Sequence, residues 1–195
     1  MKDQTKLHRC AWPTDDLKMI EYHDAEWGVP LHDDRKLFEF LVLESAQAGL
    51  SWRTVLYKRE NYRKAFAQFD PQKVARFNSR DRQRLLKDAG IIRNRAKIDA
   101  AINNAGRFLE VQEEFGTFAR YMWNFVNGKP IVNRFRSIKE LPAITPLAET
   151  VAKDLKSRGF KFLGPTVLYA HMQATGMVND HMVDCFRYKE VARSK

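Results

Sequence analysis

Apolar residues recur at helical spacing along almost the whole chain, and this periodicity limits the fold more than any other feature. The segment from 52 to 68 shows it clearly, because Val55, Leu56, Tyr62 and Phe66 share one face while basic residues occupy the other. Capping residues and helix-stopping glycines separate most such segments, and no alternation of apolar and polar residues persists as in a strand. The sequence therefore predicts an all-α fold.

The length of the chain suits one compact unit. Its 195 residues are enough for one large domain or two small lobes around a shared core. Because no linker is long enough to separate domains, we expect residues 1–195 to form a single unit of two helical lobes that share one core. No apolar run approaches the roughly 20 residues of a membrane span, and the first residues lack the apolar core of a signal peptide. We therefore expect a cytoplasmic protein with no membrane partner.

The composition is strongly basic. Lysine and arginine number 34 against 24 aspartates and glutamates, which gives a formal net charge of +10. Such an excess favours an anionic partner, with nucleic acid well ahead of an anionic membrane surface. A soluble basic protein without any such partner has the same composition, so the charge alone decides little.

A carboxylate ends the most apolar helix that the sequence predicts. Glu44 shares a face with Leu37, Phe40 and Leu41 on the helix that starts after Asp34. The other face is also largely apolar, so we expect this helix to be buried. A carboxylate on it is costly unless a donor or a cation meets it. Two interpretations stay open at this point, namely half of a structural ion pair and a ligand-binding group.

The residues that follow favour a pocket. Gly49 supplies a left-handed helix stop, and Ser51 can cap a next helix that opens with Trp52. A carboxylate, a sharp turn and a large aromatic side chain thus fall within nine residues.

A tight helical hairpin is predicted near residue 90. One helix stops at Gly90 and a long helix starts at Asn94, which turns backbone N–H groups around Gly90 and Ile92 outward together. Such a nest binds phosphate oxygens. The cations that crowd the same end are Arg93, Arg95 and Lys97. An ordinary helical hairpin with solvated arginines remains the alternative.

Four residues from the two ends of the chain could bind a metal. His181 and Cys185 stand four apart, a spacing that puts two ligands on one face of a helical turn, and Cys10 and His23 offer a second pair. Two histidines and two cysteines make a closed tetrahedral zinc shell that would join the N- and C-terminal segments. A chance pairing of His181 with Cys185 and a disulfide between the two cysteines both stay open as alternatives.

Five motifs follow one another along the chain and together carry a family resemblance. They are Tyr-His-Asp-Ala-Glu-Trp-Gly-Val-Pro (22–30), Leu-Glu-Ser-Ala-Gln-Ala-Gly-Leu-Ser-Trp (43–52), Asp-Ala-Gly-Ile-Ile-Arg-Asn-Arg (88–95), Gly-Phe-Lys-Phe-Leu-Gly (159–164) and Val-Asn-Asp-His (178–181). In this order they resemble the 3-methyladenine DNA glycosylase I family, within the helix-hairpin-helix glycosylase superfamily. The resemblance covers nearly the whole chain, from Cys10 to Cys185.

This resemblance implies a base-excision repair enzyme with the helix-hairpin-helix glycosylase fold. Its substrate would be double-stranded DNA with alkylated bases, and it would hydrolyse the N-glycosidic bond of 3-methyladenine after base flipping. The resemblance also implies a structural zinc at Cys10, His23, His181 and Cys185. A monomer is natural for an enzyme that scans DNA.

The resemblance also implies roles for the residues of the predicted pocket. Glu44 would contact the damaged base, Tyr22 and Trp52 would line its pocket with Trp12 as an accessory, and the turn at Gly49 and Leu50 would enter the gap left by the extruded nucleotide. Two positions depart from the family. Ser45 stands where many members carry glycine, which would narrow the pocket slightly, and the hairpin holds Gly90 without a second glycine, so its phosphate contacts would differ.

The chemistry of a cationic lesion explains why the chain shows no obvious pair of acid and base carboxylates. We expect Glu44 to be ionised, with its counter-charge arriving as the alkylated base. A non-catalytic, zinc-containing DNA-binding protein that recognises distorted duplex is the main alternative. A zinc module that binds proteins through its basic surface is another. Neither alternative accounts for Glu44, the aromatic residues and the hairpin together.

Overall fold

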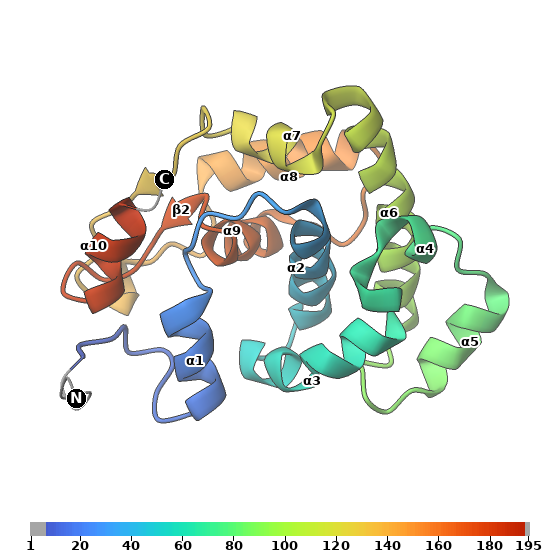
Figure 1. Ribbon diagram of the computed structural model, residues 1–195, viewed down its shortest axis with the longest axis horizontal. Coiled ribbons are helices and arrows are strands. Elements are labelled where there is room, and N and C mark those ends of the chain that lie inside the picture. The colour runs from blue at the N-terminus through green and yellow to red at the C-terminus, as the bar shows by residue number, and fades with distance from the viewer. Residues whose placement is uncertain (1–6, 194–195) are drawn as a thin grey trace.

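The computed structural model describes residues 7–193, and most of them are helical (Figure 1). The longer helices are α1 (Leu17–Ala25), α2 (Asp34–Gln47), α3 (Trp52–Ala65), α5 (Ser79–Lys87), α6 (Arg95–Phe115), α7 (Phe118–Asn124), α8 (Pro146–Ser157), α9 (Pro165–Ala174) and α10 (Phe186–Arg193). Short helical turns are η2 (Ala67–Phe69), α4 (Pro71–Val74) and η3 (Ile138–Glu140). The prediction of a helical fold is confirmed in this coarse form.

One small departure is a pair of parallel strands, β1 (Ile131–Val132) and β2 (Val178–Asn179), in which Ile131 lies opposite Val178. Two residues are too few to show an alternating pattern, so these strands could not be predicted from the sequence.

The predicted capping residues begin the helices that shape the site. Ser51 accepts a hydrogen bond from the Thr54 amide at the start of α3, and Asn94 accepts one from the Lys97 amide at the start of α6. Because these caps fix where α3 and α6 begin, they also fix the two tight connections that precede those helices.

Helix α2 forms the centre of the core. Its side chains Leu37, Phe38 and Leu43 are fully buried. In Figure 1, α2 lies between α4 and α6 on one side and α1 and α9 on the other. Asp34 joins α2 to α7, because its carboxylate accepts hydrogen bonds from the amides of Phe118 and Ala119 at 2.8 Å each. The apolar helix that carries Glu44 is therefore buried, as its sequence predicts.

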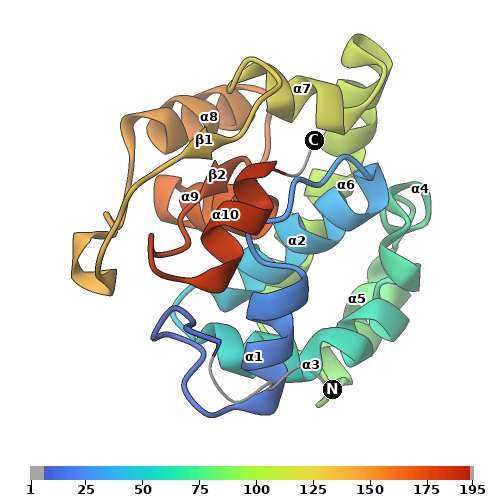
Figure 2. The same cartoon turned by 60° about the vertical axis from the view of Figure 1, so that its left-hand side comes forward.

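The segment that follows α1 packs against the C-terminal end of α9. The Gly28 amide donates to the Gln173 carbonyl at 3.0 Å, and the Leu31 amide donates to the Thr175 carbonyl at 3.0 Å. The approach is close enough that a Cβ on Gly176 would lie 2.4 Å from the backbone of Pro30. Figure 2 shows α1 and α10 on the same side of the molecule. Within residues 7–193, no helix combines the length and the apolar character that a bilayer crossing requires.

Candidate active site and metal cluster

Glu44 lies in the last turn of α2 with only 4% of its surface exposed. Among residues 7–193, no cation pairs with its carboxyl and no group hydrogen-bonds to it. Burial raises the pKa of the carboxyl to about 8, so the group holds a proton at neutral pH in the free protein. This differs from the ionised carboxylate expected from the sequence, because none of the residues that the structure describes places a positive charge beside it.

Glu39, one helical turn earlier on α2, shows the structural ion pair that was the alternative for Glu44. It is also buried, and it accepts hydrogen bonds from Arg59 at 2.6 Å and from Arg63 at 2.8 Å. Arg59 contacts Glu26 as well, at 2.7 Å. The ion-pair interpretation therefore describes Glu39. For Glu44 the remaining interpretation is a ligand-binding group.

The Glu44 carboxyl faces a cavity of about 220 Å³ whose wall includes four aromatic side chains. This volume is below the range of pockets that hold drug-sized ligands, and it suits a small flat molecule. The residues that line it are Trp12, Tyr22, Trp27, Glu44, Gln47, Trp52, Ile138, Leu141, Ala170 and Gln173. The structure thus brings together Tyr22, Trp52, Trp12 and Glu44, the predicted pocket residues.

The aromatic side chains of the cavity pack against one another, and two of their indole N–H groups make no hydrogen bond to the described residues. The rings of Tyr22 and Trp52 lie 5.1 Å apart, and Trp12 meets Tyr22 edge-on at 6.2 Å. The indole N–H groups of Trp12 and Trp52 are buried and have no hydrogen-bond partner among the described residues. Burial, reinforced by the nearby Glu44, raises the pKa of the Tyr22 hydroxyl well above its usual value, so Tyr22 stays neutral.

The turn that follows α2 projects an apolar side chain. Gly49 adopts φ +78°, the left-handed conformation predicted for a helix stop, and its neighbour Leu50 is 42% exposed. The Leu50 amide donates to the Gln47 carbonyl at 2.6 Å, which closes the turn. An exposed leucine on a tight turn beside a cavity has the form of a wedge.

The hairpin between α5 and α6 presents part of the predicted phosphate site. Arg93 and Arg95 are exposed, and among the described residues the amides of Arg93, Arg95 and Ala96 have no hydrogen-bond partner. The Gly90 amide was predicted to face a phosphate, but it donates to the Asp88 carboxylate at 2.7 Å. The outward donors are therefore those at the start of α6.

Two other predicted phosphate ligands are engaged inside the protein. The Ile92 amide donates to the Tyr62 hydroxyl at 3.1 Å. The Lys97 ammonium donates to the carbonyls of Ala46 and Ala48, at 2.8 and 2.6 Å. Neither group is therefore free to bind phosphate in the way that the sequence predicted. The packing of α3 and α2 against the hairpin places a hydrogen-bond partner next to each of them.

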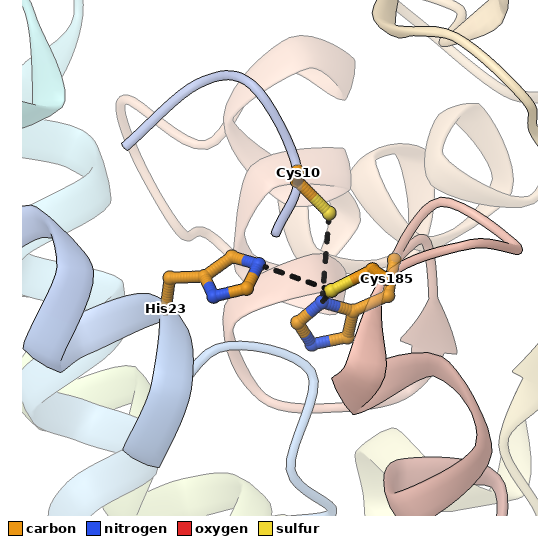
Figure 3. A group of neighbouring side chains, drawn as sticks. Cys10, His23 and Cys185 are labelled. Carbon is orange, nitrogen blue, oxygen red and sulfur yellow. Dashed lines mark hydrogen bonds between the residues drawn. The ribbon is translucent and has the colours of Figure 1, made fainter. Parts of the chain in front are cut away.

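Cys10, His23, His181 and Cys185 form a buried cluster in which the four potential ligand atoms lie within 4.8 Å of one another. Figure 3 shows Cys10, His23 and Cys185 converging from separate segments of the chain. Both cysteines are free thiols, so the disulfide alternative does not describe this structure. His181 and Cys185 lie in a turn before α10, and the predicted helical turn is wrong in that detail.

Each histidine of the cluster is oriented by a hydrogen bond on its far side. The His23 Nδ1 atom lies 2.7 Å from the Asp24 carboxylate, and the His181 Nε2 atom lies 3.0 Å from the Trp27 carbonyl. The remaining ring nitrogens face the Cys185 sulfur, at 3.6 Å for both. A hydrogen bond from the Cys10 thiol lowers the pKa of the Cys185 thiol.

Several residues of the cavity wall were not predicted. Ile138 and Leu141 belong to a segment for which the sequence predicts only irregular structure. Ala170 and Gln173 lie on α9, for which it predicts only a helix of the hydrophobic core. No local pattern marks them, because the tertiary fold alone brings them to the cavity. Ser45, expected to narrow the pocket, is buried and is not part of its wall.

Comparison with known proteins agrees with this geometry. The family model described as methyladenine glycosylase matches residues 12–188. DNA-3-methyladenine glycosylase 1 of Escherichia coli (strain K12) is 50% identical over 182 residues, which cover 93% of this chain and 97% of the relative. A DNA-3-methyladenine glycosylase of Haemophilus influenzae is 46% identical over 177 residues, covering 91% and 96%.

Solved structures give the same result at the level of the fold. A crystal structure of 3-methyladenine DNA glycosylase I superposes with a TM-score of 0.88 at 52% identity, covering 92% of this chain and 98% of the other. The enzyme from Staphylococcus aureus, studied for its recognition of 3-methyladenine, gives a TM-score of 0.89 at 39% identity, covering 92% and 96%. This chain therefore belongs to the methyladenine glycosylase family.

Proposed function

We propose that this protein is a DNA-3-methyladenine glycosylase, which hydrolyses the N-glycosidic bond of 3-methyladenine in alkylated duplex DNA. The observation that carries the proposal is the buried Glu44 carboxyl, unpaired by any described cation and facing an aromatic cavity of about 220 Å³. A related 3-methyladenine DNA glycosylase I, 39% identical to this chain, was solved as a variant in complex with 3-methyladenine.

Glu44 and the aromatic residues recognise the lesion by charge and shape. Methylation at N3 gives adenine a positive charge, and a cation beside Glu44 favours the ionised form of the carboxyl. The carboxylate then accepts a hydrogen bond from the exocyclic amine, while Tyr22 and Trp52 contact the flat cation. Two related structures carry substitutions of a tyrosine and a glutamate with the same separation in sequence as Tyr22 and Glu44.

The bond that breaks needs little acid catalysis. The C1′–N9 bond cleaves with its electron pair moving to the base, which neutralises the positive charge. The oxygen of water then bonds to C1′, and the water gives up one proton to the solvent. Unmodified adenine lacks the charge and is a poor leaving group, so it is selected against in binding and in chemistry.

Duplex DNA would be bound at the hairpin and opened at the turn. The free amides at the start of α6, with Arg93 and Arg95, suit phosphate oxygens, and Leu50 suits the space left by the flipped nucleotide. Ile92 and Lys97 support these elements from inside and do not contact phosphate in this proposal. We further propose that the chain acts as one unit and as a monomer in the cytoplasm.

The cluster of two cysteines and two histidines fits a structural zinc ion. A tetrahedral ion with Zn–S near 2.3 Å and Zn–N near 2.0 Å separates neighbouring sulfur and nitrogen ligands by about 3.5 Å. Three of the four sulfur–nitrogen distances are 3.6 to 3.7 Å, and all four ligand atoms lie within 4.8 Å of one another. Asp24 and the Trp27 carbonyl orient the rings as partners of zinc-binding histidines do. Bound zinc would join the N- and C-terminal segments next to Tyr22.

The activity is tested by incubating the protein with N-methylated duplex DNA and identifying the released bases by chromatography. We expect free 3-methyladenine from the wild type, loss of most release in Glu44→Ala, and full release in Glu149→Ala, which changes an exposed glutamate on α8. Full release by Glu44→Ala would remove Glu44 from the mechanism. Tight binding of the methylated duplex without any released base would favour the non-catalytic alternative.

The metal is tested by elemental analysis of the purified protein. We expect about one zinc per chain in the wild type and in His32→Ala, an exposed histidine outside the cluster, and loss of zinc in His23→Ala. A wild-type protein without bound metal would contradict the zinc proposal and leave the glycosylase proposal standing.

A further inference from the structure

The side chain of Lys97 links the two elements that are proposed to act on DNA. Lys97 is in the first turn of α6, and its ammonium donates to the carbonyls of Ala46 and Ala48, at 2.8 and 2.6 Å. These carbonyls belong to the C-terminal end of α2, where the last carbonyls have no partner within the helix. A cation placed there is also favoured by the helix dipole.

The carbonyls that Lys97 binds flank the turn that carries Leu50. Apart from Lys97, this turn is held by few contacts, which are the Ala48 amide to the Ser45 carbonyl at 3.4 Å and the Leu50 amide to the Gln47 carbonyl at 2.6 Å. A Cβ built on Gly49 would meet no other atom within 4 Å, so the turn stands clear of its surroundings. Among the described residues outside α2 and the turn itself, Lys97 is therefore the one whose hydrogen bonds hold the turn in place.

The other side of the hairpin is hydrogen-bonded to α3. The Lys58 ammonium donates to the carbonyls of Ala89 and Gly90, at 2.9 and 3.3 Å, and Tyr62 accepts from the Ile92 amide at 3.1 Å. Figure 1 places the connection from α2 to α3 and the hairpin before α6 along the same lower edge of the molecule. The hairpin and the turn therefore form one body, in which Lys97 is the direct connection between α6 and the turn.

We propose that Lys97 is a positioning residue that holds Leu50 at a fixed place relative to the phosphate-binding start of α6. Gripping the phosphates would then bring Leu50 to the base stack in the same binding event. This inference rests on the proposed glycosylase function. It departs from the expectation that a lysine at this end of the hairpin binds phosphate, and the two roles can be separated experimentally.

The test compares Lys97→Met with Arg93→Met, which changes an exposed hairpin cation that has no ion-pair partner among the described residues. Three quantities are measured for each protein: single-turnover release of 3-methyladenine from methylated duplex, the affinity for free 3-methyladenine, and the salt dependence of binding to undamaged duplex. Misplacing the wedge by an ångström should slow release by about 10- to 100-fold in Lys97→Met. Affinity for the free base should stay within about twofold, because the cavity is intact and the free base needs no wedge.

The salt dependence separates the two roles of the lysine. Each lost phosphate contact lowers the slope of log K against log salt by about 0.9. We expect this decrease in Arg93→Met and an unchanged slope in Lys97→Met. A slope lowered by about 0.9 in Lys97→Met, or a wild-type rate of release, would overturn the proposal.

Weakened binding of the free base by Lys97→Met would also overturn it, since Lys97 would then support the fold in general. The wild-type measurement distinguishes a failure of this proposal from a failure of the proposed glycosylase function. If the wild type releases no 3-methyladenine, the glycosylase proposal itself fails.

Discussion

Replacing Glu44 with glutamine should change how the stability of the protein depends on pH. The carboxyl has an unfolded pKa near 4.5, and burial raises its folded pKa to about 8. Between these values the folded chain holds one proton more than the unfolded chain, so the free energy of unfolding falls as pH rises. The slope for one group is about 1.4 kcal/mol per pH unit, which amounts to roughly 4 kcal/mol between pH 5 and pH 8.

Glu44→Gln keeps the shape of the side chain and removes the titration. Urea unfolding followed by tryptophan fluorescence, at one-unit steps from pH 5 to pH 9, gives the free energy of unfolding of both proteins. We expect similar stability near pH 5 and a growing advantage of Glu44→Gln up to about pH 8, with a plateau above it. The contributions of the other groups are the same in both proteins and cancel in the difference. A difference that stays constant from pH 5 to pH 9 would refute the reasoning, because Glu44 would then have the same pKa in both states.

Two further substitutions test the turn and the closure of the fold. Leu50→Ala should lower release of 3-methyladenine from duplex DNA by about tenfold or more and leave the affinity for the free base unchanged, as measured by single-turnover assay and calorimetry; equal losses in both would argue against a wedge. Gly176→Ala should destabilise the protein by more than about 3 kcal/mol in urea unfolding, because its Cβ would lie 2.4 Å from the Pro30 backbone and its φ is +70°. Gly128→Ala also has a positive φ but open space around it, so it should cost only about 1 kcal/mol, and an equal cost at the two positions would contradict the steric argument.

Local signals were enough to predict the elements that build the site. Asn94 and Ser51 cap the helices predicted from them, and Gly49 adopts the left-handed conformation because a chain that stops a helix there needs a positive φ. The apolar residues around Glu44 also predicted its burial. Each of these features depends on neighbours within one or two helical turns.

Features that depend on distant packing were beyond the sequence. The direction of the Lys97 side chain depends on where α2 ends relative to α6, and the Ile92 amide meets a tyrosine from α3. Ile138 and Gln173 reach the cavity only through the tertiary arrangement. The protonation of Glu44 depends on the absence of a cation among all the described residues around it, which no local pattern reveals. The cysteine and histidine cluster is the exception, because the family resemblance paired the two ends of the chain.

The account depends most on the unpaired Glu44 carboxyl finding its positive partner in the lesion. The measurement that tests this most directly is kcat/KM for release of 3-methyladenine from methylated duplex as a function of pH, which reports the pKa of the free enzyme. For the wild type we predict a rise with pH up to about 8, the pKa of the buried carboxyl, and for Glu44→Gln a lower value without that rise. A wild-type profile that is flat from pH 6 to pH 9, or one shared by Glu44→Gln, would contradict the claim.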